Sequence, residues 1–311
     1  MSLFARPILT NGATHPAQQF RMLVRDLARG NEGITEGDDL KVSQLSTPGG
    51  SVQVSDGSGV IRGRANVFQG TYSVCNIGSA TVPIAPTGAS GRSDMVIVRV
   101  EDPEYEGSLN PQIDQITYFQ VISNVSASAT SIPDGRTGIP LARIDIPANT
   151  STITNAMIKD VRSVANPRRD RQLYTQSPTA DSTAIGASTT WTYFSTAPGW
   201  NIAVPVWATQ VKIKVDVSPI RYNIGPFLGA LRATFGSSLT LQPISLDDNQ
   251  TGTRKLPAIV ADTLTIPAAY RGTTQLLRAQ ANGASDNGPG RIAVTSYTTL
   301  VADVEFVEAP R

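Results

Sequence analysis

Hydrophobic and polar residues alternate along much of the chain with a period of two. Val52 and Val54 are flanked by polar residues, and residues 211–217 alternate valine or isoleucine with lysine and aspartate. Successive side chains of a strand point to opposite faces, so this alternation predicts strands with one buried face. Residues 95–100 are apolar apart from Arg99, which predicts a strand covered on both faces.

Turn-forming residues separate these runs. The sequence Asp56-Gly57-Ser58-Gly59 predicts a hairpin that joins the strand at 52–54 to a returning strand at 60–68. Gly70 breaks the apolar pattern, and a further strand is expected from Thr71.

One stretch, residues 15–29, has the period of an α-helix. Its apolar stripe consists of residues spaced i, i+3, i+4 and i+7, namely Phe20, Leu23, Val24 and Leu27. A single amphipathic helix beside β domains must pack on a sheet or on another chain. We therefore take these four residues as candidate contacts with another subunit or another protein.

The ends of this helix carry boundary signals. Thr14 or His15 is expected to cap it, with Pro16 in the first turn and Gly30 as the stop. Residues 1–13 before it read as an extended arm that is either disordered or pinned to a neighbour, because its apolar residues are costly to leave in water. These residues are Leu3, Phe4, Ile8 and Leu9.

The pattern divides the chain into an arm and helix (1–30), a first antiparallel β domain (31–165), a linker (166–188) and a second β domain (189–311). The best boundary is the sequence NPRRDRQ at 166–172, where Pro167 halts regular structure and a basic cluster follows. Roughly eight strands in the last domain favour a β-sandwich of jelly-roll type. The predicted fold class is all-β, with the N-terminal arm and helix as additions.

Charge and cysteine content narrow the choice of function. The chain has 311 residues with 26 basic and 25 acidic side chains, a net charge of +1, which gives no electrostatic case for nucleic acid or an anionic membrane. No segment approaches the roughly 20 apolar residues of a membrane span, and the first residues lack the apolar core of a signal peptide. Cys75 is the only cysteine, so no intrachain disulfide is possible. We expect a soluble protein that is made in the cytoplasm and used without secretion.

Candidate catalytic groups are few. His15 is the only histidine, so any histidine-based triad or acid–base step would depend on a residue at the start of a helix. Three carboxylate pairs leave glycoside hydrolysis formally open: Asp38/Asp39, Glu104/Glu106 and Asp247/Asp248. All are expected in loops, where solvated charge is the default, and Asp247-Asp248-Asn249 reads as a turn. No catalytic residue, cofactor or metal site is predicted.

Aromatic residues gather at the start of the second domain, where Trp191, Tyr193, Phe194, Trp200 and Trp207 occur. They either fill the core of the sandwich or form an exposed platform that stacks on sugar rings. Trp200 follows Pro198-Gly199, and its place at a turn makes it the first candidate for glycan binding. Tyr222 and Tyr270 are further candidates of the same kind.

Three stretches together carry a resemblance to a known family. The first is SVQVSDGSGVIRGRANVFQGTYSV with RSDMVIVRVED after it, the second is GIPLARIDIPANTSTIT with IKDVR at 158–162, and the third is TLTIPAAYRGTTQLLRAQA with the terminal VADVEFVE. The chain resembles the minor tail proteins of long-tailed phages that infect actinobacteria. The first two stretches resemble the assembly-facing domain of such baseplate proteins, and the third resembles their distal β-sandwich.

This resemblance implies a non-enzymatic virion component of the tail tip. It implies other phage tail proteins as partners and assembly as a symmetric homo-oligomer, for which we expect a trimer. Because the chain has two domains of unlike composition and no catalytic set, we expect the distal domain to contact a glycan of the host cell surface. Two alternatives remain open at this point: a purely architectural tail subunit that binds no receptor, and a cell-wall glycan hydrolase.

Overall fold

The computed structural model describes residue 4 and residues 6–311, and it divides the chain into two compact units. The N-terminal unit comprises Met1–Pro167 together with Ala309–Arg311, and the C-terminal unit comprises Arg168–Glu308. Nearly all regular structure is antiparallel β-sheet, with one α-helix among the described residues, so the predicted all-β class is confirmed.

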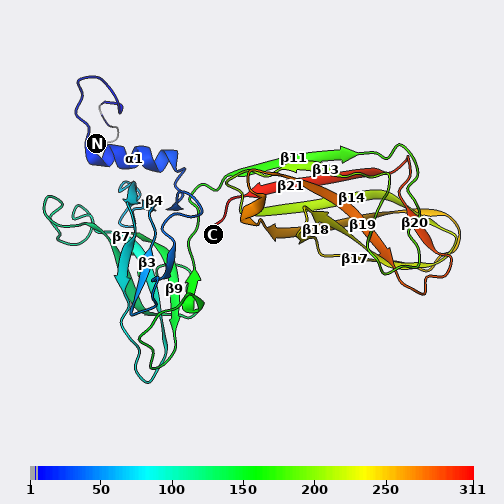
Figure 1. Cartoon of the computed structure of the whole chain (residues 1–311). Helices are drawn as coiled ribbons and strands as arrows, with labels where there is room; N and C mark the ends of the chain where they lie inside the picture. The colour runs from blue at the N-terminus through cyan, green and yellow to red at the C-terminus, as the bar shows by residue number, and fades with distance from the viewer. Residues whose placement is uncertain (1–3, 5) are drawn as a thin grey trace. The chain divides into compact units, whose positions relative to one another are not determined.

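The N-terminal unit contains α1 (Ala17–Leu27) and three antiparallel sheets (Figure 1). The first sheet has the order β1-β4-β5, the second β2-β3-β6 and the third β10-β9-β7-β8. The strands are β1 (Gly33–Ile34), β2 (Val42–Gln44), β3 (Ser51–Val54), β4 (Gly57–Arg62), β5 (Thr71–Asn76), β6 (Ala80–Pro83), β7 (Arg92–Val100), β8 (Thr117–Val125), β9 (Gly138–Ile146) and β10 (Ile158–Asp160), with a 3₁₀ turn η1 (Asn155–Met157).

The C-terminal unit contains two antiparallel sheets. One has the order β11-β21-β14-β18, with β20 beside the end of β14, and the other has β19 and β15 at its centre. The strands are β11 (Arg169–Gln176), β12 (Thr192–Tyr193), β13 (Trp200–Ala203), β14 (Gln210–Asn223), β15 (Phe227–Phe235), β16 (Leu239–Thr240), β17 (Ile244–Asp248), β18 (Arg254–Thr265), β19 (Thr274–Gly283), β20 (Arg291–Ala293) and β21 (Thr299–Val307), with a 3₁₀ turn η2 (Ala268–Tyr270).

The order of the strands in the C-terminal unit is that of a jelly roll. If β11, β13, β14, β15, β17, β18, β19 and β21 are counted from first to eighth, the two sheets read 1-8-3-6 and 2-7-4-5. This is the double-sheet arrangement of two Greek keys. The sequence-based expectation of a jelly-roll sandwich therefore agrees with the strand order.

Strand β14 is at the centre of this unit. It pairs with β21 on one side and β18 on the other (Figure 1), and its inward residues Val211, Ile213, Val215 and Val217 are buried. They join one contiguous apolar core that both sheets line. The alternation predicted at 211–217 is present residue by residue, with Lys212 and Lys214 on the outer side.

The N-terminal unit has a core of its own. It is built mainly from valine, isoleucine and leucine of β3, β4, β7 and β9, including Val52, Val54, Ile61, Val98 and Leu141. In β7, residues 93–98 are all buried, on both faces, as the apolar run predicted.

The hairpin predicted between residues 52–54 and 60–68 does not form. Strand β3 pairs with β2 and β6, whereas β4 pairs with β1 and β5. The turn residues make a corner at which the chain passes from one sheet to another. Gly57 lies there with φ +140°, and a Cβ would stand 2.5 Å from Cα of Asp39. The returning strand also ends at Arg62, well before residue 68.

The predicted linker at 166–188 is not a linker throughout. Residues 169–176 form β11, which pairs with β21 along its whole length. The sequence of β11 is mostly charged and polar, so its pattern did not predict a strand. An edge strand needs no continuous apolar face. The chain then returns to the N-terminal unit at residue 309, where the Arg311 N–H donates to the Gly37 carbonyl at 3.1 Å.

The helix is shorter than expected and lacks the predicted cap. It begins after Pro16, and neither Thr14 nor His15 caps it; no side-chain cap bond is present at its start. Residues 6–13 contain turns instead of an extended arm, and they are tied to α1 by Gln19, whose Nε2 donates to the Arg6 carbonyl at 2.7 Å. Of the apolar arm residues, Leu3 lies outside the described part of the chain.

Phe235 offers a direct test of the jelly-roll core. It is fully buried and packs edge-on against Tyr270, with ring centroids 6.2 Å apart. Phe235→Ala is expected to lower the free energy of unfolding of the C-terminal unit by about 3–5 kcal/mol, because it opens a cavity. Urea unfolding followed by tryptophan fluorescence measures this, since all three tryptophans lie in that unit. Leu173→Ala, at an exposed position, is the control and should change stability by less than about 0.5 kcal/mol.

Candidate interaction surfaces

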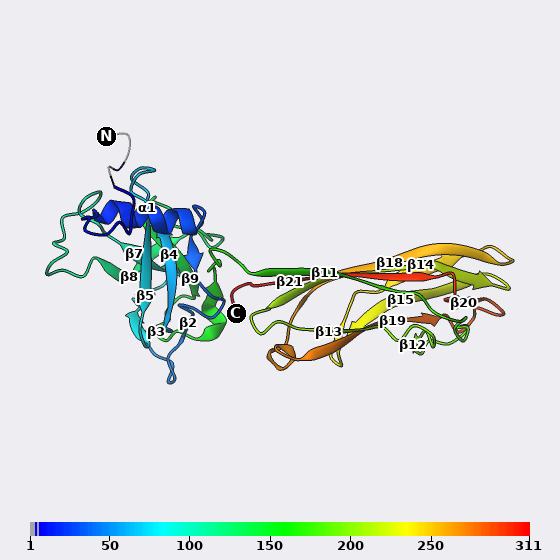
Figure 2. The ribbon, with the colours of Figure 1, turned by 90° about the horizontal axis from the view of Figure 1, so that it is seen from above.

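Helix α1 packs against β5 (Figure 2). Gly70, just before β5, has φ +81°, and a Cβ at this position would stand 2.7 Å from the backbone carbonyl carbon of Arg21. Only glycine fits both the backbone conformation and the space. Gly70 therefore fixes how near the helix comes to the sheet.

Arg21 is the polar anchor of the helix. Its Nε donates to the Gln69 carbonyl at 2.8 Å and its Nη2 donates to Glu104 at 2.7 Å. The guanidinium lies over the Tyr72 ring at 5.4 Å and the Tyr105 ring at 5.3 Å. Burial and then the hydrogen bond to Asp102 raise the pKa of Tyr72, so its hydroxyl remains a donor. These contacts hold α1 to both β5 and the loop at 101–116.

Because Arg21 and the buried Ala28 occupy the side of α1 that faces the sheet, the apolar stripe is only partly covered. Leu23 and Val24 are half-buried, whereas Phe20 is 46% exposed and Leu27 is 72% exposed. These are the four residues that the sequence suggested as contacts with another subunit.

Two grooves follow one another along α1, and residues of the stripe line both of them. One, of about 660 Å³, runs between α1, β5 and the loop at 101–116, with Phe20, Val24, Pro103, Pro111 and Ile116 in its walls. Another, of about 260 Å³, is lined by Val24, Leu27 and Ala28 together with residues of the first sheet. The helix thus presents apolar side chains beside apolar hollows, which is a surface suited to a protein partner.

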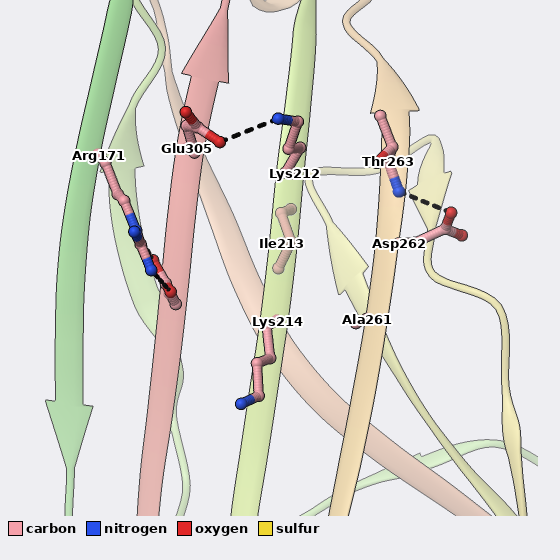
Figure 3. A pocket seen from close by; sticks show the side chains of 9 residues that line it. Arg171, Lys212, Ile213, Lys214, Ala261, Asp262, Thr263 and Glu305 are labelled. Carbon is pink, nitrogen blue, oxygen red and sulfur yellow. Dashed lines mark hydrogen bonds and ion pairs between the residues drawn. The ribbon is translucent and has the colours of Figure 1, made fainter.

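The outer face of the β11-β21-β14-β18 sheet is charged and balanced. Figure 3 shows Arg171, Lys212 and Lys214 on this face, with Glu305 between Arg171 and Lys212, beside a hollow of about 500 Å³. Arg171 Nε donates to Asp303 at 2.8 Å, and Lys212 Nζ lies 3.1 Å from Glu305. The hydrogen bond from Arg171 lowers the pKa of Asp303 despite the opposing effect of burial. Cross-strand ion pairs therefore neutralise most of this face.

The three aromatic residues proposed for glycan stacking are all buried. Trp200 is at an inward position of β13 opposite Leu277, Tyr222 packs edge-on against Phe227, and Tyr270 packs against Phe235. Strand alternation, not the nearby turn, sets the direction of Trp200, which shares the inward face with Ile202. The expectation that these residues form an exposed platform is therefore wrong.

Two other aromatic residues do lie on a sheet's outer face. Tyr193 of β12 is 39% exposed, and Trp191, two residues earlier, is partly exposed. Arg232 lies over the Trp191 ring at 4.0 Å and Arg278 lies over the Tyr193 ring at 4.5 Å. The spacing of Trp191 and Tyr193 was visible in the sequence, but their arginine partners come from β15 and β19.

The carboxylate pairs considered for hydrolysis are largely occupied. Glu104 is held by Arg21, Asp248 by Arg254 and Asp38 by Arg311. The turn predicted at Asp247-Asp248 is instead the end of β17, paired with β15, so the two side chains point to opposite faces.

The remaining candidates for chemistry are isolated. His15 Nδ1 lies 3.3 Å from Gln19 Oε1, and Cys75 is an exposed free thiol in β5. Within residue 4 and residues 6–311, no group of three or more histidine, cysteine, aspartate or glutamate side chains is placed to hold a metal ion. Over the same residues, no helix has the length and apolarity needed to span a membrane.

These features define an all-β protein with a jelly-roll unit and a helix-bearing unit. No family model matches the chain, and no curated protein matches its sequence. Among solved structures, the chain is similar to a chain in the structure of the infectious bursal disease virus Gx strain. The identity is 12% over 93% of this chain and 82% of the viral chain, with a TM-score of 0.28.

Two further solved structures match with lower TM-scores. The VP2 subviral particle of infectious bursal disease virus gives 12% identity over 92% of this chain and 86% of that chain, with a TM-score of 0.27. The insecticidal delta-endotoxin Cry8Ea1 from Bacillus thuringiensis gives 9% identity over 90% of this chain and 52% of that chain, with a TM-score of 0.18. At these TM-scores the similarities establish no shared fold, so function is argued from the chain's own residues.

Gly70→Ala tests the close approach of α1. The new Cβ would press on the Arg21 backbone, so we expect faster amide exchange throughout α1 and a loss of stability beyond the cost of a positive φ. Gly78→Ala is the matched control, because Gly78 has a similar φ of +78° and nothing within 4 Å of an added Cβ. Its cost should be only about 1 kcal/mol, the usual penalty for a left-handed residue. Equal α1 exchange in the two variants, measured by hydrogen–deuterium exchange, would contradict the role given to Gly70.

Asp303 gives a pH dependence with a defined sign. Its pKa is lower in the folded than in the unfolded chain, so its ion pair stabilises the C-terminal unit above about pH 4 and the stabilisation disappears as the pH falls through the folded pKa. The urea midpoint of the wild type should therefore fall more steeply than that of Asp303→Asn between about pH 5 and pH 2. In an Arg171→Gln background, Asp303→Asn should alter the slope much less. If Asp303→Asn changes the slope as much in the Arg171→Gln background as in the wild type, Arg171 is not the cause of the lowered pKa of Asp303.

Proposed function

We propose that this chain is a non-enzymatic structural subunit of a phage virion, located at the tail tip. The N-terminal unit attaches the subunit to other tail proteins or to further copies of itself. The C-terminal jelly roll is the part that meets the host cell surface. The phrases of sequence that resemble minor tail proteins lie in both units, which supports one role for the whole chain.

The observation that carries this proposal is the exposed apolar stripe of α1. Phe20 and Leu27 remain in contact with water although the helix is anchored by Arg21 and Gly70. Burying such side chains is worth roughly 25 cal/mol per Å² of apolar surface. A partner that covers the stripe and fills the flanking grooves would gain that free energy, and the rigid anchor means that little order has to be created on binding.

A homotrimer is the assembly that we propose. The contacts in a closed three-membered ring are heterologous, so each copy contributes two different patches and the stripe of one copy meets the second patch of the next. The loop at 101–116, with Pro103, Pro111 and Ile116 in the far wall of the larger groove, supplies an apolar patch of this kind. A purely architectural subunit would use the same attachment surface and would differ only in lacking host contact.

Substitutions in the stripe test the attachment. The double variant Phe20→Asp/Leu27→Asp should fold, because both side chains are largely exposed, and should lose association by placing two charges in the interface. Light scattering on purified chain is expected to give three times the chain mass for the wild type and the single-chain mass for the variant. Ile77→Asp, exposed elsewhere on the same unit, is the control and should remain associated.

Location in the virion needs a separate measurement. Immunogold labelling with antibody against the purified chain should decorate one end of the tail in particles of the phage that encodes it. Particles carrying the double variant should lack the label. Labelling of the head alone, or no labelling of intact particles, would refute the tail-tip assignment, and unaltered incorporation of the double variant would refute the role of α1.

A further inference from the structure

Two aromatic–arginine stacks lie side by side on the outer face of the sheet formed by β12, β19 and β15. Tyr193 is directly opposite Gln280 of β19, and the Tyr193 hydroxyl reaches across β19 to Thr234 Oγ1 of β15 at 3.1 Å. Trp191 likewise reaches Arg232 of β15. Both rings therefore extend over the sheet surface instead of standing away from it.

Each guanidinium is held along one edge. The Gln280 side-chain oxygen, in the amide orientation that satisfies both groups, accepts from Arg232 Nε at 2.8 Å and Nη2 at 3.0 Å. Arg278 Nε donates to the Ala197 carbonyl at 3.0 Å, and its Nη2 donates to the Phe194 carbonyl at 3.1 Å. In both arginines Nη1 makes no hydrogen bond with the described part of the chain. The two donors are thus fixed in place and still available to a ligand.

These two arginines also differ from their counterparts on the opposite sheet in charge compensation. Arg171 and Lys212 pair with Asp303 and Glu305, whereas no carboxylate among the described residues lies within 4.0 Å of Arg232 or Arg278. Their hydrogen-bond partners are neutral amide and carbonyl oxygens. The result is a local positive charge beside aromatic rings in a protein whose net charge is only +1.

We infer that this surface, defined by Trp191, Tyr193, Arg232 and Arg278, binds an acidic saccharide. Aromatic rings offer an apolar face for the C–H side of a pyranose ring, and an arginine fork recognises a carboxylate. Arg278 and Gln280 are two residues apart on β19, so the stacks repeat at about 7 Å along the strand. Acidic sugars of one polymer chain can therefore meet both stacks. This inference rests on the proposed contact with the host surface and names its ligand class and residues.

The test uses the full chain and oligogalacturonides as the probe. Isothermal titration should detect binding that weakens as salt is raised, because charge pairing contributes to it. Dextran, a neutral polymer of hexoses, should not bind measurably. We expect Arg232→Gln and Arg278→Gln each to weaken binding about tenfold, with Trp191→Ala weakening it at least as much.

Matched variants separate binding from folding. Arg169→Gln, on the outer face of the other sheet, should bind as the wild type does. Trp191→Phe keeps an aromatic face and should restore most of the binding lost in Trp191→Ala, and Arg232→Lys should not replace the fixed guanidinium. Circular dichroism and urea midpoints confirm that the variants remain folded.

Three outcomes would overturn the inference. They are no binding of oligogalacturonides at millimolar concentration, equal weakening by Arg169→Gln, and equally tight binding of inorganic polyphosphate, which would reduce the surface to a general anion site. None of these bears on immunogold labelling of the tail tip. The saccharide site can therefore fail while the proposed virion role stands, and the reverse also holds.

Discussion

The C-terminal unit depends on the burial of one face of β14. This fourteen-residue strand pairs with β18 and β21, and its end also pairs with β20, so it links three other strands into one sheet. Its inward valine and isoleucine residues form the floor of the core, and its outward lysines meet the acidic residues of β21. The same alternation therefore stabilises the sandwich and sets which residues are offered to solvent.

The N-terminal unit is governed by a different constraint, the close approach of α1 to β5. Gly70 leaves no side chain between them, and Arg21 occupies the near side of the helix. Because Arg21 takes part of that side, the apolar stripe faces the sheet only through Leu23 and Val24, and Phe20 and Leu27 point toward solvent. The exposed stripe is thus a consequence of how the helix is fastened.

The two sheets of the jelly roll have outer faces of different character. On one, basic and acidic residues of neighbouring strands alternate and neutralise each other. On the other, aromatic rings lie on arginines whose hydrogen-bond partners are neutral. A paired face gains little from a charged ligand, since its charges are already satisfied. The aromatic face retains fixed donors and exposed ring surface, so the two sides of one domain have different capacities for binding.

The sequence by itself determined the strand faces at 211–217, the doubly covered strand at 95–98, the existence of the helix and the all-β class, because these follow from local periodicity and burial. It did not determine which strands pair. The chain from β3 to β4 turns a corner between sheets, the supposed linker supplies β11, and Trp200 faces inward while Trp191 and Tyr193 lie outside. Pairing and register bring together residues such as Trp191 and Arg232 that are 41 positions apart. Only the tertiary structure could decide those contacts, because their free energy arises between segments whose local patterns contain no information about each other.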